Sequence, residues 1–263
     1  MAPLRKSCLN YNFFSAAGGN PNPAVLYNLT MFKYKPALAL AVCALLSAPV
    51  FSADWVIPRT TYYISAEQQE LPGFPAPPAP GSAADLRDLS VLKSWQSRRT
   101  PEQCAKANAA ANAGFEDFFR GISPFPSPLP EGAAVIFARV KAETDGAAAG
   151  IKERFKRDRP FLRDASLEPC LGRIGGLSYP SGHAAISRMF ALMLGDLVPA
   201  RKKEFLARAD TAALERVIGG VHHPSDIAAG KELADRLYRA YRESPAFRAD
   251  MAALRGMLKK DAR

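Results

Sequence analysis

Histidine is scarce in this sequence of 263 residues, which has only His183, His222 and His223 to carry imidazole chemistry. Beyond the N-terminal region no apolar run reaches 18 residues, which excludes a polytopic membrane protein. The four cysteines form no close pair, which excludes a zinc ribbon and a Cys-x-x-Cys redox site. Strand patterns are nearly absent and the sequence has no internal repeat. These absences favour a helical fold whose chemistry depends on a few side chains.

Residues 31–53 have the order of segments that is typical of a secretory signal peptide. Lys33 and Lys35 form a short basic segment, and residues 37–48 form an apolar stretch of 12, too short to span a bilayer as a mature helix. The small residues that follow predict cleavage near Ser52. We therefore expect a signal peptide at 31–52 rather than a buried helix, and a periplasmic or secreted protein without a membrane span in the mature chain.

The first 30 residues contain no acidic side chain and no helical or strand periodicity. Because the signal pattern begins at Met31, we interpret residues 1–30 as an upstream extension outside the fold; an unusually long basic segment before the signal is the alternative. Residues 1–53 hold four basic and no acidic side chains, so the net charge of +10 for the whole chain falls to +6 without them. This charge favours anionic partners.

The rest of the chain divides into an arm and a helical domain. Residues 53–82 end in LPGFPAPPAPGS, which predicts an extended, Pro-rich arm rather than a core element. In residues 83–263 one helical pattern follows another, so we expect an all-α fold with a single helical-bundle domain.

Start and stop signals divide this domain into helices. Thr100, Pro101 and Gln103 form the pattern of a capped helix start, Pro160 is expected to end a helix, and Ser244 is expected to cap the last one. The expected helices span about 100–119, 131–144, 147–157, 181–194, 201–219, 226–241 and 245–258, after an amphipathic segment around 86–95.

Three segments together have the composition of an anion site: KERFKRDRP at 152–160, PSGH at 180–183 and RVIGGVHHPSD at 216–226. Ser181 and Gly182 begin a helix, where free amides and the helix dipole favour phosphate. Lys152 and Arg159 are seven residues apart, about two helical turns, so both can point to one face. Arg159 and Arg216 can each donate paired hydrogen bonds to phosphate oxygens.

The histidines complete this set. His222 and Asp226 are four residues apart, a spacing that brings a carboxylate to one nitrogen of the imidazole and raises its basicity. His183 supplies a second imidazole from another helix. A nucleophile, an orienting carboxylate, a general acid and three cations are the groups that covalent phosphoryl transfer needs.

The patterns K-x6-RP, P-S-G-H and R-x5-H-x3-D, in this order, resemble the signature of the phosphatidic acid phosphatase type 2 / vanadium haloperoxidase superfamily. The signal peptide, the size and the helical body are similar to its secreted branch, the bacterial class A non-specific acid phosphatases. The motifs cover residues 152–226, and we expect the resemblance to extend over about 80–260.

The resemblance implies a role for each matching residue. Lys152, Arg159 and Arg216 would bind phosphoryl oxygens together with Ser181 and Gly182. His183 would protonate the leaving alcohol, His222 would be the nucleophile, and Asp226 would orient His222. His223 breaks both spacings, so we expect it at the site rim or as a polar loop residue. The family often has serine before the arginine of the third motif; here it is Glu215, which must point away or pair with a cation.

The resemblance predicts a periplasmic acid phosphatase that hydrolyses small phosphate monoesters through a phosphohistidine, with no cofactor and no metal. A phosphatase for lipid phosphates or diphosphates is the alternative, and a vanadium-dependent haloperoxidase is a weaker one because those enzymes tend to be much larger. A zinc protein is disfavoured because three cations would repel the metal. The sequence has no basic-aromatic pattern of the kind that a dedicated nucleic-acid partner requires. It does not decide whether the protein is a monomer or a homo-oligomer.

Cys104 and Cys170 are the only cysteines that remain after the expected cleavage. Export places them in an oxidising compartment, so we predict a disulfide between them. Two buried free thiols are the alternative.

Overall fold

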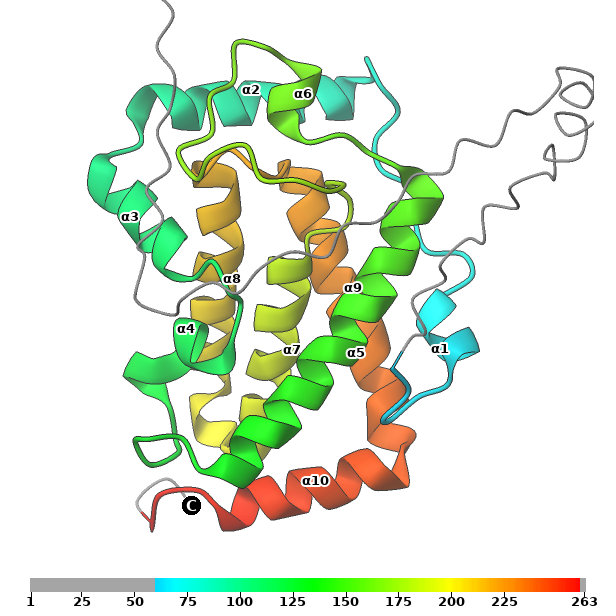
Figure 1. The fold of residues 1–263 in the computed structure, drawn as a ribbon, viewed down its shortest axis with the longest axis vertical. Coiled ribbons are helices and arrows are strands. Elements are labelled where there is room, and N and C mark those ends of the chain that lie inside the picture. Colours follow the sequence, from blue (N-terminus) through cyan, green and yellow to red (C-terminus); the bar gives the residue numbers. More distant parts are fainter. Residues whose placement is uncertain (1–59, 261–263) are drawn as a thin grey trace, which may run out of the picture. The chain divides into compact units, whose positions relative to one another are not determined.

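The computed structural model describes residues 60–260, which belong to one compact unit. The predicted extension at 1–30, the signal peptide at 31–52 and residues 53–59 of the predicted arm lie outside this range. The described chain is helical and contains no strand, which confirms the all-α fold (Figure 1). Within residues 60–260, no helix has both the length and the apolar character needed to cross a bilayer.

The described residues form ten α-helices and two short 3-10 helices. Their bounds are α1 (Ala66–Glu70), α2 (Ala83–Arg98), α3 (Pro101–Ala109), α4 (Phe115–Phe119), η1 (Arg120–Ile122), α5 (Glu131–Phe155), α6 (Pro160–Arg163), α7 (Gly182–Leu197), η2 (Pro199–Arg201), α8 (Lys202–Ile218), α9 (Pro224–Glu243) and α10 (Pro245–Gly256).

Helix α7 is the central element of the bundle. It packs against α8, α9 and α5, and Figure 1 shows it enclosed by these three helices. Its sequence is apolar on almost every face, and side chains such as Met189, Phe190 and Leu194 are fully buried. A helix that is apolar all round requires partners on every side. The position of α7 is therefore fixed by its neighbours, and so is the direction in which its N-terminus points.

The predicted helix starts are confirmed where the signal is local. The Thr100 side chain accepts the Gln103 amide, and the Gln103 side chain accepts the Thr100 amide. Ser181 and Ser244 cap α7 and α10 in the same position. Such caps depend on three or four consecutive residues only, which is why the sequence reveals them.

Two predicted helix boundaries are wrong. Residues 131–144 and 147–157 do not form separate helices but the continuous 25-residue helix α5. Gly146 lies inside this helix, where glycine costs about 1 kcal/mol relative to alanine. A Cβ atom there would lie 3.6 Å from Gln69 Oε1, so the glycine lies where the N-terminal segment packs.

The second boundary concerns the predicted helix at 100–119, which is interrupted. Helix α3 ends at Ala109, Ala113 has a left-handed φ of 53°, and Gly114 begins α4. The chain therefore changes direction at residues 110–114, the α3–α4 connection, instead of continuing α3.

The described part of the predicted arm, residues 60–82, is not separate from the core. Tyr63, Ile64 and Phe74 are buried in the main hydrophobic cluster, and α1 lies between them. Glu143 Oε1 on α5 accepts hydrogen bonds from the Tyr63 amide at 3.2 Å and the Ile64 amide at 3.1 Å. A buried carboxylate that binds backbone amides ties this segment to the bundle. The prolines limit regular structure here, but they do not prevent packing.

The predicted disulfide is present, with Cα atoms 5.9 Å apart and a sequence separation of 66 residues. It joins Cys104 on α3 to Cys170 in the loop that leads to α7.

We expect the double substitution Cys104→Ser/Cys170→Ser to lower the free energy of unfolding by about 2–4 kcal/mol, because the bond closes a long loop in the unfolded chain. Urea denaturation of a chain that begins at Ala53 measures this value, with wild type under reductant as the control. Two alkylatable thiols in the unreduced, denatured wild type would contradict the bond.

Candidate active site

The N-terminus of α7 forms one wall of the candidate site. Ser181 is its N-cap, and its hydroxyl accepts the Ala184 amide at 3.3 Å. The amides of Gly182 and His183 belong to the first turn, where they have no intrahelical acceptor. The structure therefore places Ser181 and Gly182 as the sequence predicts, at the positive end of a buried helix.

Helices α7 and α9 approach each other closely at this wall. The Ser181 amide donates to the Asp226 carbonyl at 3.0 Å. A Cβ atom on Gly230 would lie 2.4 Å from the Ser181 carbonyl oxygen, a distance that no real contact allows. Glycine at this position of α9 is thus a condition for the close approach of the two helices.

Lys152 and Arg159 converge, but not along one helix as predicted. Helix α5 ends at Phe155, Lys156 adopts a left-handed φ of 46°, and Arg159 is the N-cap of α6. The Lys152 ammonium donates to the Leu177 carbonyl at 2.5 Å. Burial, aided by the charge of Arg159, lowers the pKa of Lys152 to about 8. The two cations therefore lie close enough to repel each other.

Arg216 supplies the third cation from the last turn of α8. It is buried, donates one hydrogen bond to the Ala107 carbonyl at 3.3 Å, and leaves its Nε without a partner. Burial and the charge of Arg159 lower the pKa of Arg216 to about 10. The neighbouring Glu215 pairs with Arg208 at 3.6 Å, which is one of the two outcomes expected for it. A buried guanidinium with an unused donor suits an anion as its acceptor.

His222 is buried and faces Arg159. Arg159 Nη1 lies 2.8 Å from His222 Nε2. A guanidinium only donates, so Nε2 must carry the lone pair and Nδ1 the proton. His222 Nδ1 faces Asp226 Oδ2 at 3.5 Å, which is too long for a strong hydrogen bond. Burial lowers the pKa of His222 well below its usual value, so the ring is neutral and Nε2 can act as a nucleophile.

His223 lies in the loop between α8 and α9, which is one of the two predicted places, but it is fully buried, so the alternative of a site-rim residue is wrong. Its Nδ1 lies 2.9 Å from Asp226 Oδ2, and its Nε2 lies 3.1 Å from Arg163 Nη1. As the N-cap of α9, it also donates its amide to Asp226 at 2.7 Å. His223 therefore faces away from Arg159, into the protein interior, and is the closer imidazole partner of Asp226.

Asp226 is the centre of an ionic network that sequence reasoning missed. Arg157 donates to Asp226 Oδ1 at 2.7 Å, and the Ser178 hydroxyl donates to Oδ2 at 2.5 Å. Burial alone would raise the pKa of Asp226, but hydrogen bonds from His222 and His223 hold it well below its usual value. Arg157 also contacts Asp85 and Asp88 of α2 at 3.2 and 3.0 Å. This network holds the rear of the site.

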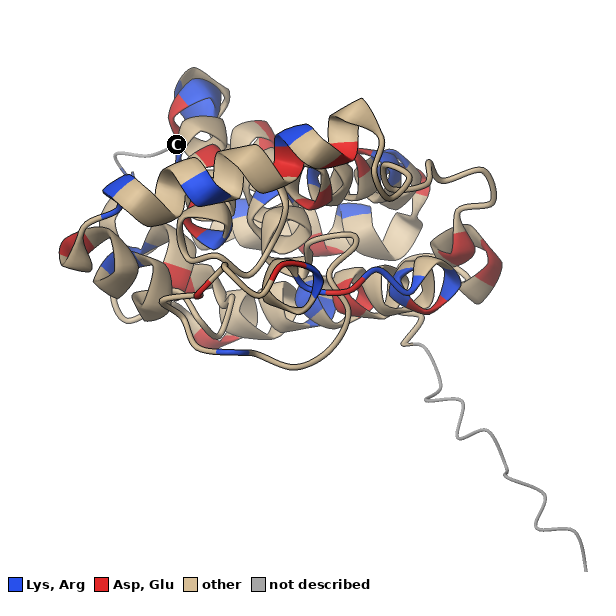
Figure 2. Ribbon diagram, turned by 90° about the horizontal axis from the view of Figure 1, so that it is seen from above, with Lys and Arg blue, Asp and Glu red and all other residues tan. Residues whose placement is uncertain are grey.

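The spacing of Asp85 and Asp88, three residues apart, gives no signal that distinguishes them from surface carboxylates. Arg157 lies in the basic run whose ends were predicted as ligands, but nothing in that run marks it as the buried member. Figure 2 shows positive and negative residues interspersed over this end of the bundle.

His183 lies on the side of the site next to the α3–α4 connection. Its Nε2 donates to the Ala110 carbonyl at 3.0 Å, and its ring meets Phe118 edge-to-face at 6.1 Å. Burial and the charge of Arg216 lower the pKa of His183 to about 3. The unliganded ring is therefore neutral and carries a proton on Nε2.

The arrangement thus brings together a neutral imidazole, the buried guanidinium groups of Arg159 and Arg216, the partly exposed Lys152 and a helix N-terminus. Such a combination favours an anion with several oxygens. Among residues 60–260, no group of three or more histidine, cysteine, aspartate or glutamate side chains converges in a way that could hold a metal ion.

Comparison with known proteins reveals a similarity to one superfamily. Residues 133–234 match the model of the PAP2 superfamily. This stretch contains all the predicted catalytic and phosphate-binding residues, from Lys152 to Asp226. The part of the chain that supplies the candidate site is therefore similar to the PAP2 superfamily.

Curated relatives extend the similarity to most of the chain. A non-specific acid phosphatase of Providencia stuartii is 28% identical over 227 residues, which are 79% of this chain and 91% of that protein. An acid phosphatase of Zymomonas mobilis is 28% identical, covering 77% and 80%. A non-specific acid phosphatase of Salmonella typhi is 29% identical, covering 73% and 81%. A solved transmembrane PAP2-type phosphatidylglycerolphosphate phosphatase of Bacillus subtilis has a TM-score of 0.47 at 20% identity, covering 62% and 86%.

The lowered pKa values predict a stability that declines in acid. In the unfolded chain a histidine has a pKa of about 6.5. In the folded protein the pKa of His183 is about 3, and the pKa of His222 is also well below 6.5. The unfolded chain thus binds more protons in this window, so the stabilisation is complete above pH 6.5 and is lost as the pH falls. We expect His183 to contribute a loss of about 1 kcal/mol per pH unit between pH 6 and 4, and His222 to add a loss in the same direction.

Urea denaturation of phosphate-free protein at several pH values measures this loss. His183→Asn should reduce the slope by about 1 kcal/mol per pH unit, and added phosphate should flatten the slope because an anion raises the pKa of both histidines. Equal slopes for wild type and the variant would refute the assignment to His183.

Proposed function

We propose that this protein is an acid phosphatase that hydrolyses phosphate monoesters through a phosphohistidine at His222, without a metal. The observation that carries the proposal is the hydrogen bond from Arg159 to His222 Nε2. It directs the lone pair of the imidazole toward a phosphate-binding cation. The similarity to non-specific acid phosphatases along most of the chain supports the same reaction.

In the first step, Lys152, Arg159 and Arg216 bind the phosphoryl oxygens together with the amides of α7. His222 Nε2 then attacks phosphorus, the N–P bond forms and the ester P–O bond breaks. The leaving oxygen takes a proton from His183. The proton on His222 Nδ1 stays directed at Asp226, which stabilises the positive charge that develops on the ring.

In the second step, water attacks the phosphohistidine. His183 accepts a proton from this water, the N–P bond breaks, and inorganic phosphate leaves with His222 neutral again. The bound phosphate dianion is expected to raise the pKa of His183 above its unliganded value of about 3, because it compensates the charge of Arg216. Substrate binding would thus prepare the general acid.

The proposed location is outside the cytoplasm. The signal pattern at residues 31–52 and the disulfide both favour export. Three cations and a helix N-terminus supply the positive charge that a metal would otherwise bring.

Hydrolysis of p-nitrophenyl phosphate should continue in EDTA and should be inhibited by orthovanadate, which mimics the trigonal-bipyramidal transition state when bound to His222. Steady-state rates measure both effects. Loss of activity in EDTA with recovery on adding zinc would contradict the metal-independent mechanism. Full activity in millimolar vanadate would contradict the assignment of this site as the phosphate-binding site.

Acid-quenched wild type should carry phosphate on His222, and His222→Ala should lose both the adduct and turnover, by about a thousandfold or more. His223→Asn is the matched control: it disturbs Asp226 and slows turnover, but the adduct still forms on His222. His183→Ala should slow substrates with basic leaving groups most. An adduct on His223, or near-normal turnover by His222→Ala, would reverse the assignment.

A further inference from the structure

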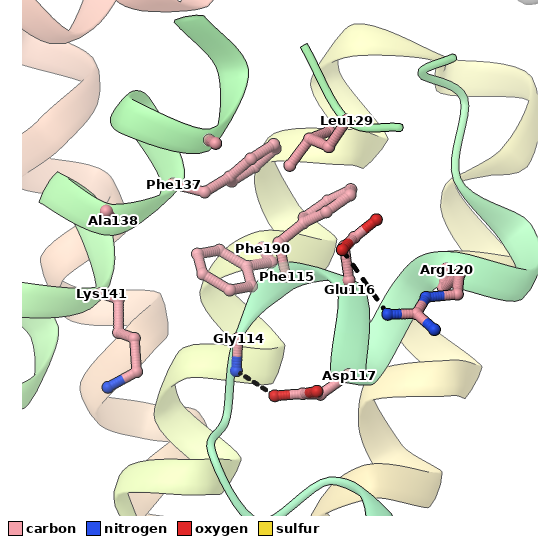
Figure 3. A pocket seen from close by; sticks show the side chains of 11 residues that line it. Gly114, Phe115, Glu116, Asp117, Arg120, Leu129, Phe137, Ala138, Lys141 and Phe190 are labelled. Carbon is pink, nitrogen blue, oxygen red and sulfur yellow. Dashed lines mark hydrogen bonds and ion pairs between the residues drawn. The ribbon is translucent and has the colours of Figure 1, made fainter. Parts of the chain in front are cut away.

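A cavity of about 350 Å³ opens between α4, α5 and α7, beside the candidate active site. Figure 3 shows that rings from the three helices converge on it. Phe115 and Phe137 stack with centroids 4.0 Å apart, and Phe190 meets Phe137 edge-to-face at 5.1 Å. All three rings are buried in the core. We call this space the phenylalanine cavity; its floor is apolar and fixed by packing.

The rim of the phenylalanine cavity is charged, but each charged side chain already has a partner. The pairs are Glu116 with Arg120 at 3.6 Å, Lys141 with Asp145 at 2.6 Å, and Asp117 with the Gly114 amide at 2.8 Å. Four of the five charges thus cancel in ion pairs, the Asp117 carboxylate accepts a hydrogen bond from the protein, and the floor of the cavity remains apolar. Such a surface favours an uncharged, apolar occupant.

One end of the cavity points toward the phosphate-binding residues. Lys141 and Gly114 lie at one end, and Leu129 lies at the other (Figure 3). Along α5, Lys141 is followed by Asp145 and then by Lys152, so the Lys141 end is nearer the site. A Cβ atom on Gly182 would lie 3.5 Å from Asp145 Oδ1, which places this rim against the N-terminus of α7.

The residues between the two are partly exposed to solvent. Gly182, His183, Asp145 and Lys141 are all partly exposed, whereas Arg159, Arg216 and His222 are buried beneath. A substrate whose phosphate reaches the cations can therefore extend along α5 without crossing the core.

The in-line geometry of the reaction determines from which side of the site the leaving group departs. In phosphoryl transfer the attacking and leaving groups lie roughly in line on opposite sides of phosphorus. With His222 as the nucleophile, the leaving oxygen must face His183, which contacts Ala110 and Phe118. The leaving group thus emerges toward the α3–α4 connection and α4, where the phenylalanine cavity opens.

We propose that the phenylalanine cavity binds the organic part of the substrate, and that this part is an uncharged chain ending in an aromatic ring. The inference rests on the proposed phosphatase function and goes beyond it by naming the class of leaving group. The stacked pair Phe115 and Phe137, with Phe190 edge-on beside it, lines the cavity with the aromatic surface against which a flat apolar group packs.

The test compares 3-phenylpropyl phosphate with propyl phosphate, whose alcohols have nearly the same acidity, so the difference reports binding of the ring. Wild type should prefer the phenylpropyl ester by roughly tenfold in kcat/KM, mostly through KM. Ala138→Trp fills the mouth of the cavity from an exposed position on α5 and should reduce this ratio at least fivefold. Ala252→Trp, the same substitution at an exposed position of α10, is the matched control and should leave the ratio unchanged.

The inference is overturned if kcat/KM for the two esters differs by less than twofold in wild type, or if Ala138→Trp leaves their ratio unchanged. Turnover of propyl phosphate and inhibition by vanadate would then still support the proposed phosphatase function. If wild type hydrolyses neither ester and does not bind vanadate, the proposed function fails and this inference falls with it. Should Ala138→Trp fail to fold, Ala134→Trp fills the same mouth from the preceding turn of α5.

Discussion

The buried carboxylate of Asp226 is the group on which the arrangement of the site depends. A charge inside a protein is tolerated only when donors surround it, and here donors come from separate parts of the chain. Arg157 follows α5, Ser178 precedes α7, and His223 begins α9. Satisfying one carboxylate therefore brings three helix ends together. The same convergence brings His222 to Arg159, with Lys152 and Arg216 close enough to Arg159 to be affected by its charge.

That convergence leaves an imbalance of charge. Behind Asp226 every positive group has acidic partners, whereas in front of it Lys152 and Arg216 bind backbone carbonyls instead of acids. Their lowered pKa values express the cost of burial and of repulsion from Arg159, which nearby carboxylates offset only in part. Active sites commonly give up stability in this way, because the missing interaction is the one that the substrate supplies.

Local signals predicted the parts of this structure that depend on a few consecutive residues. The caps at Thr100, Ser181 and Ser244 are of this kind, and the spacing around His222 identified the imidazole that faces Arg159. The continuity of α5 through Gly146 could not be predicted, because tertiary packing outweighs the local preference of glycine. His223 contacts Arg163 of α6 and Ser178, which are distant in sequence, so spacing alone could not reveal that it is buried.

Gly230 shows how far this tight arrangement extends from the chemistry. It touches no phosphate and donates nothing, yet a single methyl group there would push the Ser181 carbonyl away from α9. The amides of Gly182 and His183 would move with it, and so would the anchoring of Asp226 to α7. In a redesign of this enzyme, Gly230 would thus be among the residues that tolerate substitution least, although it has no side chain. Many exposed residues on the same helix could be substituted freely.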